Sequence, residues 1–598
     1  MTRELVIRNG LVVDGTGRPG APADVRIVDG TIADVGVHVD AGRGATVVDA
    51  DGLLVTPGFV DLHTHYDGQA TWDPFLAPSC EHGVTSLVMG NCGVGFAPAH
   101  PTVEQHDWLI GMLEGVEDIP GTALAEGLPW DWETFPQYLD ALERRRFVLD
   151  VGTHVTHAPL RAYVMGERGA DPLEAPTPDE LDAMSAAVRE GVEAGALGFT
   201  TSRTYAHRTN RGAPLGTRFS SADELIALVG AMGDRGVVQM ISDAYLSTDE
   251  DFVRDELRLM RSIIEQTGRP LSMTVQQPEH VPDRWREMAG WVDAAVADDL
   301  PLRMQVAPRS IGVLQGLQAT VNPIALCPSY RDIADLDLEA RVIALRDPER
   351  RRRLIAEHAA TGAGLDGFML TLFTAFERLF PMGDPVDYEP APSDSVAARA
   401  ARHGLDPVEE VLDLLVEDDG RRLLYMTLFN YARGDLSDVR EMLLSPNSVI
   451  GLSDAGAHCG AICDGSFPTT ALALWSTRRE GALPVELMVH HLTQRTARQV
   501  GWLDRGVLAP GHLGDVNVID LERLAAHPPH IVRDLPAGGR RLVQSASGYV
   551  RTVKRGVVTF ADGEATGELP GQLVRGARAA PTGRRSAPPP TWPPPDRS

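Results

Sequence analysis

Eight short apolar runs, separated by longer segments of helical character, most constrain how this chain can fold. The first run follows Pro57-Gly58, and the other seven lie at residues 84–89, 147–151, 196–199, 237–241, 271–275, 302–306 and 449–452. Short strands that alternate with helices are typical of parallel β/α units. We therefore predict an α/β fold in which residues 57–504 form a (β/α)8 barrel.

Two stretches inside this region are longer than ordinary connections between elements. They cover about residues 97–146 and about residues 310–445, and the second is rich in charged, helix-forming residues. Each stretch follows the end of a predicted strand, where barrel enzymes build their active sites and lids. We expect both to be insertions that contribute to the site or to its cover.

The two ends of the chain share a different character. Residues 1–56 and 505–570 are rich in short strand-like runs separated by turns. We predict that the two segments together form one small β-sandwich domain. Residues 571–598 are rich in proline and arginine and are predicted to be a disordered or extended tail. A docking peptide for a partner is the alternative interpretation of that tail.

Charge and composition exclude several classes of partner. The 598 residues include 55 basic and 83 acidic side chains, a formal net charge of −28, which argues against binding nucleic acid or an anionic membrane. No apolar run is long enough to span a membrane, and no secretory leader pattern follows Met1. Five cysteines are too few for a disulfide scaffold in a chain of this size. We expect a cytoplasmic protein acting on a small molecule, and self-association into a homo-oligomer is left open.

A pair of histidines follows the first predicted barrel strand. His63 and His65 are two residues apart, so their side chains point to the same face of an extended segment. Neutral imidazole is a common metal ligand, and two rings on one face can share one ion. Such a pair is often structural when it stands alone, so its meaning depends on the rest of the chain.

Four further motifs lie at or just after predicted strands. They occupy residues 90–98, which contain Asn91-Cys92-Gly93, and residues 156–166, 198–205 and 451–458, the last containing Ser453-Asp454-Ala455-Gly456. Together with His63 and His65, they resemble the N-acyl-D-amino-acid deacylase (D-aminoacylase) branch of the amidohydrolase superfamily. The resemblance covers most of residues 1–570, and the Asn-Cys-Gly motif is specific to this branch.

The resemblance implies a metal centre. It makes His63, His65, Cys92 and Asp454 metal ligands, a set that zinc accepts readily. It also makes Asp454 the general base, because a carboxylate beside an activated water can take its proton and pass it to the leaving nitrogen. The alternative roles are a small buried residue for Cys92 and a helix cap for Asp454.

The chain departs from the family pattern in its middle strands. Typical D-aminoacylases supply two further histidine ligands there, but residues 268–277 contain none, and Val275 lies at or near the expected position. Only His280 could enter from this part of the barrel. We therefore expect one well-held metal ion, most simply zinc.

The residues expected to recognise the substrate also differ from the family. Residues 459–468 lack the arginine that usually grips the substrate carboxylate, whereas Tyr205 matches a tyrosine that the family uses near the substrate. The tentative substrate residues are Tyr205, Arg203, His157, Arg309, His207 and His280, and Arg208 and His154 are further candidates. We expect simple N-acetyl-D-amino acids to be poor substrates.

The leading functional prediction is a metal-dependent amidohydrolase that cleaves the C–N bond of an N-acylated amino acid or a related small molecule. A metal-dependent lyase or decarboxylase on the same barrel is the second candidate. A non-catalytic relative that only binds a ligand is the third, and the joint presence of His63, His65, Cys92 and Asp454 argues against it.

Overall fold

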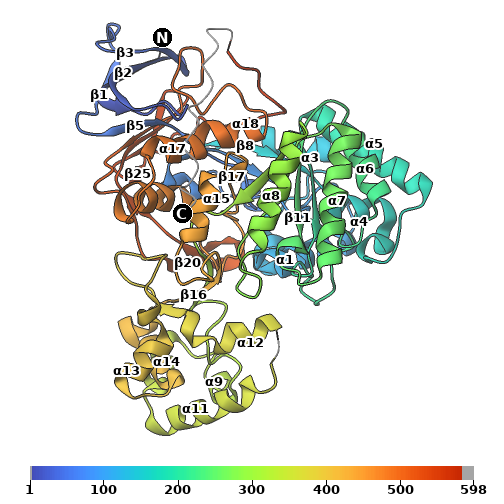
Figure 1. Cartoon of the computed structure of the whole chain (residues 1–598), viewed down its shortest axis with the longest axis vertical. Helices are drawn as coiled ribbons and strands as arrows, with labels where there is room; N and C mark the ends of the chain where they lie inside the picture. Colours follow the sequence, from blue (N-terminus) through green and yellow to red (C-terminus); the bar gives the residue numbers. More distant parts are fainter. Residues whose placement is uncertain (1–2, 366, 582–598) are drawn as a thin grey trace.

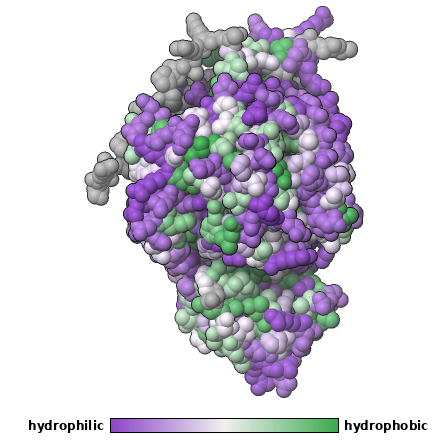
Figure 2. Space-filling model, turned by 90° about the vertical axis from the view of Figure 1, so that its right-hand side faces the viewer, coloured by the Kyte–Doolittle hydropathy of each residue, from purple (hydrophilic) through white to green (hydrophobic). Residues whose placement is uncertain are grey.

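The computed structural model describes residues 3–365 and 367–581. Three regions are visible in Figure 1: a β-rich region that contains both blue and dark red strands, a central α/β body, and a smaller helical lobe in yellow. In Figure 2 the face turned to the viewer is mostly hydrophilic, and apolar residues gather more densely around the narrower lower lobe. Within the described residues, every helix is too short or too polar to cross a membrane.

One nine-stranded sheet draws strands from both ends of the chain. Its spatial order is β25 (Glu564–Ala565), β24 (Val557–Ala561), β23 (Tyr549–Lys554), β18 (Val516–Ile519), β5 (Leu54–Pro57), β1 (Glu4–Val12), β2 (Ala21–Val28) and β3 (Thr31–Gly36), with β4 (Thr46–Asp49) paired to β1. The two ends meet where β18 pairs antiparallel with β5. Val25, Val55, Val516 and Val553 are fully buried in the shared core. Burial of these apolar side chains therefore requires both ends of the chain.

The central body contains parallel strands in two groups. The first group is β6 (Phe59–Asp61), β7 (Val84–Met89) and β8 (Asp150–Thr153); the second is β9 (Val155–Thr156), β10 (Gly198–Arg203), β11 (Val237–Ser242), β12 (Leu271–Thr274), β13 (Leu302–Val306) and β17 (Ser448–Ile450). Only His154 separates β8 from β9, and a parallel bridge between Thr64 and Ala455 joins the segments after β6 and β17. Each of the eight predicted strand regions contains or overlaps one of these strands.

Helices cover the outside of the parallel strands (Figure 1). They are α4 (His157–Met165), α5 (Pro178–Ala194), α6 (Ala222–Gly230), α7 (Glu250–Thr267), α8 (Arg284–Ala297), α15 (Ser437–Leu444), α16 (Phe467–Ala473), α17 (Val485–His490) and α18 (Thr496–Gln499). The helix α5 shows how the sequence sets the boundaries: Thr177 and Glu180 form a capping box, and Gly195 ends the helix with a φ of 119°. Helix α7 buries Val253, Leu257 and Met260 on one face.

The first predicted insertion packs beside the strand ends. It contains α1 (Val103–Glu117), α2 (Gly121–Gly127) and α3 (Phe135–Glu143). Leu109, Met112 and Leu113 of α1 are buried in the main core, and the Trp132 indole donates a hydrogen bond to the carbonyl of Phe96 at 2.8 Å. These contacts hold the C-terminal end of α1, and with it Glu117, against the strand ends.

The second predicted insertion forms the lower lobe. Its strands β14 (Ile311–Gln315), β15 (Leu379–Pro381) and β16 (Leu424–Phe429) form an antiparallel sheet, and its helices are α9 (Pro328–Arg331), α10 (Leu338–Leu345), α11 (Pro348–Gly362), α12 (Gly367–Thr374), α13 (Val396–His403) and α14 (Pro407–Leu415). Leu345, Leu354, Val396 and Val411 have no exposed surface and form a core separate from that of the main body. Two small antiparallel pairs complete the strands, β19 (Ala525–Ala526) with β22 (Ala546–Ser547), and β20 (His530–Leu535) with β21 (Gly539–Val543).

A buried ionic network joins the β domain to the start of β8. The Asp150 carboxylate lies 2.8 Å from both the Arg505 guanidinium and the Lys554 ammonium, and 3.0 Å from Arg555. Lys554 also contacts Asp515 at 2.8 Å. Burial alone would raise the pKa of Asp150, but the charges of Lys554 and Arg505 hold it well below its usual range.

The first part of the predicted disordered or extended tail packs against the main body. Residues 571–581 lie against the main body rather than forming a disordered segment: Leu573 and Val574 are buried, and Gly571 bridges Phe147. The guanidinium of Arg575 pairs with Asp140 at 2.6 Å. The run of prolines in the predicted docking peptide, residues 588–595, lies outside the described residues.

Candidate active site

Three potential metal ligands converge where two neighbouring strands end. His63 and His65 follow β6, and Cys92 follows β7. One ring nitrogen from each histidine and the Cys92 sulfur all lie within 4.8 Å of one another, and Cys92 Sγ is 3.3 Å from His63 Nε2. All three side chains are buried. This is a compact nitrogen and sulfur cluster of the kind that holds a transition metal.

Asp454 approaches the same point from the loop after β17. Its Oδ1 lies 3.2 Å from His63 Nε2 and 3.6 Å from His65 Nε2. The preceding Ser453 hydroxyl donates to Asp61 Oδ2 at 2.6 Å and lies 3.0 Å from the His63 carbonyl, which ties this loop to the end of β6. The Asp454 side chain is 26% exposed whereas that of His63 is 1% exposed, so Asp454 forms the side of the cluster that faces solvent.

The backbone around two of these residues adopts an uncommon conformation. Cys92 has a φ of 54° and Asp454 a φ of 45°, both in the left-handed region that non-glycine residues rarely occupy. Two side chains hold the Cys92 loop: Gln239 Oε1 accepts a bond from the Cys92 N–H at 2.7 Å, and Thr200 Oγ1 accepts one from the Gly93 N–H at 3.0 Å. Strained backbone of this kind clusters at functional sites, because surrounding contacts must maintain it.

A buried amide orients the ring of His63. His63 Nδ1 lies 2.6 Å from Gln305 Oε1, which can only accept, so Nδ1 carries the proton. The Gln305 amide nitrogen in turn donates to Ser272 Oγ at 2.9 Å. His63 Nε2 is consequently left with a lone pair directed at Cys92 and Asp454, which is the tautomer a metal ligand requires.

Glu117 is a site residue that the sequence did not reveal. It ends α1 in the first insertion, is buried, and places Oε1 3.3 Å from His65 Nδ1. Its other oxygen lies 3.8 Å from His458 Nε2, and its backbone carbonyl accepts the N–H of His458. No local motif links Glu117 to His65, because only the packing of α1 brings the two together.

Several nitrogen and oxygen atoms of the cluster lack an aligned hydrogen-bond partner. Asp454 Oδ1 is buried without a hydrogen-bond partner among the described residues, and His65 Nδ1 and Glu117 Oε1 contact each other at 3.3 Å without forming an aligned hydrogen bond. Burial raises the pKa of the Cys92 thiol to about 11, despite the nearby His65. Burial also acts to raise the pKa of Asp454, but His63 and His65 hold it well below its usual range. A divalent cation would satisfy these atoms and stabilise the thiolate, so the residues fit a zinc-type centre.

Two of the tentative substrate residues lie near the cluster. His207 bonds Ser202 Oγ through Nδ1 at 2.8 Å, and burial followed by the charges of His65 and His458 lowers its pKa to about 3. Tyr205 is 43% exposed, and its backbone N–H donates to Asp243 at 2.9 Å. The His207 imidazole is therefore neutral, and the Tyr205 phenol is accessible to solvent.

Two of the predicted arginines are engaged in ion pairs instead, and the third lies on the surface. Arg203 pairs with Glu256 through several bonds, including one of 2.9 Å, and also donates to the carbonyl of Ser220. Arg309 is fully buried and pairs with Asp464 at 2.6 Å. Arg208 donates to the Gly212 carbonyl at 2.9 Å on the exposed surface. Buried guanidinium groups require acidic partners, and here those partners come from within the chain.

Three predicted histidines also have structural contacts. His157 is buried between Thr201 Oγ1 at 2.9 Å and Glu224 Oε1 at 3.1 Å. His280 contacts the carbonyl of Leu246 at 2.7 Å and does not join the cluster. His154 is buried, its backbone N–H donates to the carbonyl of Met89, and burial lowers its pKa to about 3. The structure therefore does not bring His157 or His280 to the metal ligands.

Two other residues at the mouth were not singled out from the sequence. Burial raises the pKa of the Tyr245 phenol, and the negative charges of Asp243, Cys92 and Asp454 act in the same direction, so its hydroxyl is protonated and can donate. The Arg218 guanidinium lies 3.6 Å from Asp243 and 5.9 Å from the centre of the Tyr205 ring. Neither residue belongs to a short motif; both reach this place through loops after β10 and β11.

Comparisons with known proteins agree with this geometry. A family model described as "Amidohydrolase family" matches residues 46–560. An uncharacterised protein of Mycobacterium tuberculosis is 26% identical over 97% of this chain and 95% of its own length. The D-aminoacylase of Alcaligenes xylosoxydans xylosoxydans is 34% identical over 34% of this chain and 38% of its own length.

A solved structure has a similar fold. It is the N-acyl-D-glutamate deacylase of Bordetella bronchiseptica, complexed with zinc and a phosphonate inhibitor. It is 23% identical to this chain, has a TM-score of 0.61, and the match covers 96% of this chain and 99% of that one. At this level of identity the likeness concerns the fold.

Proposed function

Because the chain belongs to the amidohydrolase family, in its D-aminoacylase-like branch, we propose that it hydrolyses the amide bond of a small N-acylated amino acid or a closely related compound. The chain is a hydrolase of C–N bonds other than peptide bonds. The convergence of His63, His65, Cys92 and Asp454 is the observation that carries the proposal.

The proposed architecture is one closed (β/α)8 barrel with a small β domain built from both chain ends. The parallel order of the strands, the minimal gap between β8 and β9, and the bridge between Thr64 and Ala455 support closure. The pairing of β18 with β5 supports a shared β domain. In such a barrel the cluster lies at the carboxyl ends of the strands, where barrel enzymes place their catalytic groups.

One divalent ion, most simply zinc, is proposed to bind His63, His65, Cys92 and Asp454. When bound, such an ion polarises a carbonyl and lowers the pKa of a coordinated water. The middle strands support a single ion, because residues 268–277 contain no histidine and His280 contacts the carbonyl of Leu246 instead of the cluster.

Asp454 is proposed to move the proton during hydrolysis. Its carboxylate is the partly exposed member of the cluster and is held in its ionised form, so it can accept a proton from water and deliver it to the leaving nitrogen. The Tyr245 hydroxyl and the neutral His207 ring are proposed to donate hydrogen bonds to the substrate. Arg203 and Arg309 form short ion pairs within the chain, whereas Arg218 lies 3.6 Å from Asp243 and beside Tyr205, so Arg218 is the cation proposed to receive a substrate carboxylate.

Metal content and turnover measured together test this proposal. Cys92→Ala should strip or weaken the bound metal and abolish most turnover, whereas Cys327→Ala, a buried cysteine in the lower lobe, should preserve both. Activity should be profiled on N-acyl-D- and N-acyl-L-amino acids with defined zinc loading, and the products identified. Full metal content and turnover in Cys92→Ala would contradict the ligand set, and products without hydrolysis would indicate a lyase.

A further inference from the structure

A large cavity lies at the amino ends of the parallel strands, opposite the metal cluster. Its volume is about 1120 Å³, and its walls come from the residues that lead into β10, β11 and β12, from the start of β13 and β17, and from α18. The metal cluster lies beyond the other ends of these strands, so the cavity is separate from the candidate active site. Its volume is sufficient for a small-molecule ligand.

Arginine dominates the charged lining of this cavity. Six arginines line it, Arg235, Arg269, Arg303, Arg495, Arg498 and Arg575, against two acidic residues, Glu193 and Asp234. Arg575 pairs with Asp140 and Glu143, and Arg235 lies 4.0 Å from Asp234. Arg269, Arg303, Arg495 and Arg498 have no carboxylate within 4.0 Å in residues 3–365 and 367–581. Four such arginines therefore share one cavity in a chain with a formal net charge of −28.

The contacts of these four arginines leave donors available. Arg303 donates to the backbone carbonyl of Leu302 at 2.7 Å. Arg495 donates to that of Pro446 at 2.8 Å, and its other terminal nitrogen lies 3.0 Å from His491 Nε2. The Arg269 Nε–H is buried without a hydrogen-bond partner among the described residues. A guanidinium group has five N–H donors, so one carbonyl bond leaves most of them unused.

In addition to burial, the charges of these arginines lower the pKa values of titratable groups in the cavity. Burial and the charge of Arg303 lower the pKa of Arg495 to about 10. Burial also lowers the pKa of His490, which lines the same cavity, to about 4, and Arg495 and Arg498 act in the same direction. An anion in the cavity would offset these positive charges.

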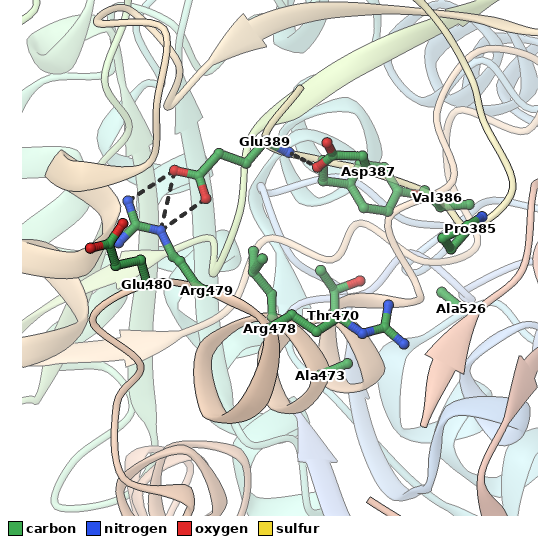
Figure 3. Close-up of a pocket in the computed structure, with 12 residues that line it drawn as sticks. Pro385, Val386, Asp387, Glu389, Thr470, Ala473, Arg478, Arg479, Glu480 and Ala526 are labelled. Carbon is green, nitrogen blue, oxygen red and sulfur yellow. Dashed lines mark hydrogen bonds and ion pairs between the residues drawn. The ribbon is translucent and has the colours of Figure 1, made fainter. Parts of the chain in front are cut away.

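A cavity elsewhere in the molecule contains one arginine whose charge is neutralised by a carboxylate of the chain. The cavity in Figure 3, about 660 Å³ in volume, is lined by Arg478 and Arg479. Arg479 forms a two-pronged ion pair with Glu389, with bonds of 2.9 Å, and Arg478 donates to the carbonyl of Leu524. The charge of Arg479 is thus neutralised by the chain itself, which is not the case for the four arginines of the larger cavity.

We propose that this arginine-lined cavity binds a small anion carrying two or more phosphate or carboxylate groups. Guanidinium groups match both oxyanions through paired N–H bonds, and several arginines around one cavity favour a ligand with several anionic groups. The site would be independent of the metal cluster and of the hydrolytic reaction.

Calorimetric titration of the full chain with pyrophosphate and, separately, with citrate tests the proposal, with acetate at equal ionic strength as the control. At least one of the two should bind with a dissociation constant below about 1 mM. Arg303→Gln combined with Arg498→Gln should weaken binding at least tenfold. Arg258→Gln, which removes an arginine paired to Asp255 on the exposed face of α7, should leave binding unchanged.

The probe with the lower dissociation constant identifies whether the cavity prefers phosphate or carboxylate groups. Arg498→Gln alone changes an exposed side chain, so it keeps the test valid if the double variant folds poorly. Absence of binding by both probes would overturn the proposal. So would binding that is lost in Cys92→Ala but kept in the arginine variants, because the anion would then occupy the metal cluster.

Discussion

The two ends of the parallel strands carry opposite electrostatic imbalances. At the carboxyl ends, His63, His65, Cys92 and Asp454 direct their ligand atoms at one point, and among the described residues Asp454 forms ion pairs with these two histidines alone. At the amino ends, four arginines line a cavity without acidic partners. Between these regions, buried charges such as those around Asp150 are paired.

This difference contrasts the charges around Asp150, which are paired within the chain, with the two regions where we propose that a ligand binds. Buried ions in proteins are normally paired, because an unpaired charge is expensive to bury. The Asp150 network obeys that rule, whereas Arg303 and Arg495 are partly buried and have no carboxylate within 4.0 Å in the described residues. A cation at one end and an anion at the other would restore the balance, and each half of this comparison can be tested separately.

Asp454→Asn should have the largest effect on function. Asparagine preserves size and an oxygen ligand but cannot accept a proton from water, so turnover should fall by about 10²- to 10⁴-fold. The measurement is kcat at saturating metal, alongside metal content. Asp234→Asn, an exposed carboxylate at the other end of the strands, is the matched control. Wild-type turnover in Asp454→Asn would assign proton transfer to another group.

Asp150→Asn should have the largest effect on stability, because it leaves Arg505 and Lys554 buried without their shared partner. Breaking a buried pair in this way costs about 3–5 kcal/mol. The pKa of Asp150 is held below its usual value in the fold, so its contribution is present above about pH 4 and is lost as the pH falls further. Unfolding measured at pH 7 and at low pH should show a difference from wild type that shrinks on acidification. A difference independent of pH would indicate that packing, not charge, is the cause.

Changes at Glu117 should weaken the metal centre without removing a ligand. Glu117→Ala should reduce metal affinity by about 10- to 100-fold, because the partner that orients His65 is lost. Glu117→Gln keeps an oxygen that can accept the Nδ1 proton, so its effect should be smaller. Chelator competition gives the affinities, with Glu104→Gln at the start of the same helix as the control. Equal affinity in all three variants would exclude a role for Glu117 in orienting His65.

The sequence predicted the elements of the body more fully than the contacts between them. The strand regions and the residues His63, His65, Cys92 and Asp454 could be identified because each lies in a local pattern or motif at a strand end. Glu117 could not, because its place depends on how α1 packs against a distant loop. Local patterns encode elements and strand ends, whereas long-range packing decides which loop side chains meet.

The ion pairs of the charged residues could not be predicted from the local sequence either. Arg203 and Arg309 follow predicted strands, as substrate-binding residues would, but the sequence does not reveal that Glu256 and Asp464 lie beside them. Conversely, Arg303 and Arg495 are unremarkable in the sequence, since their significance lies in the absence of nearby carboxylates among the described residues. Whether an arginine is paired is a property of the folded chain.

The smallest effect is expected from removing one arginine of the unbalanced cavity. Arg303→Gln should leave stability unchanged or raise it by up to about 1 kcal/mol at low ionic strength, because it relieves repulsion with Arg495. The gain should vanish at high salt, which screens the repulsion, and in the presence of an anion that binds the cavity. Thermal unfolding at low and high salt, with and without pyrophosphate, measures both effects. A loss of stability under all four conditions would mean that the chain itself holds Arg303 favourably, and the contrast between the two ends of the strands would then rest on the metal cluster alone.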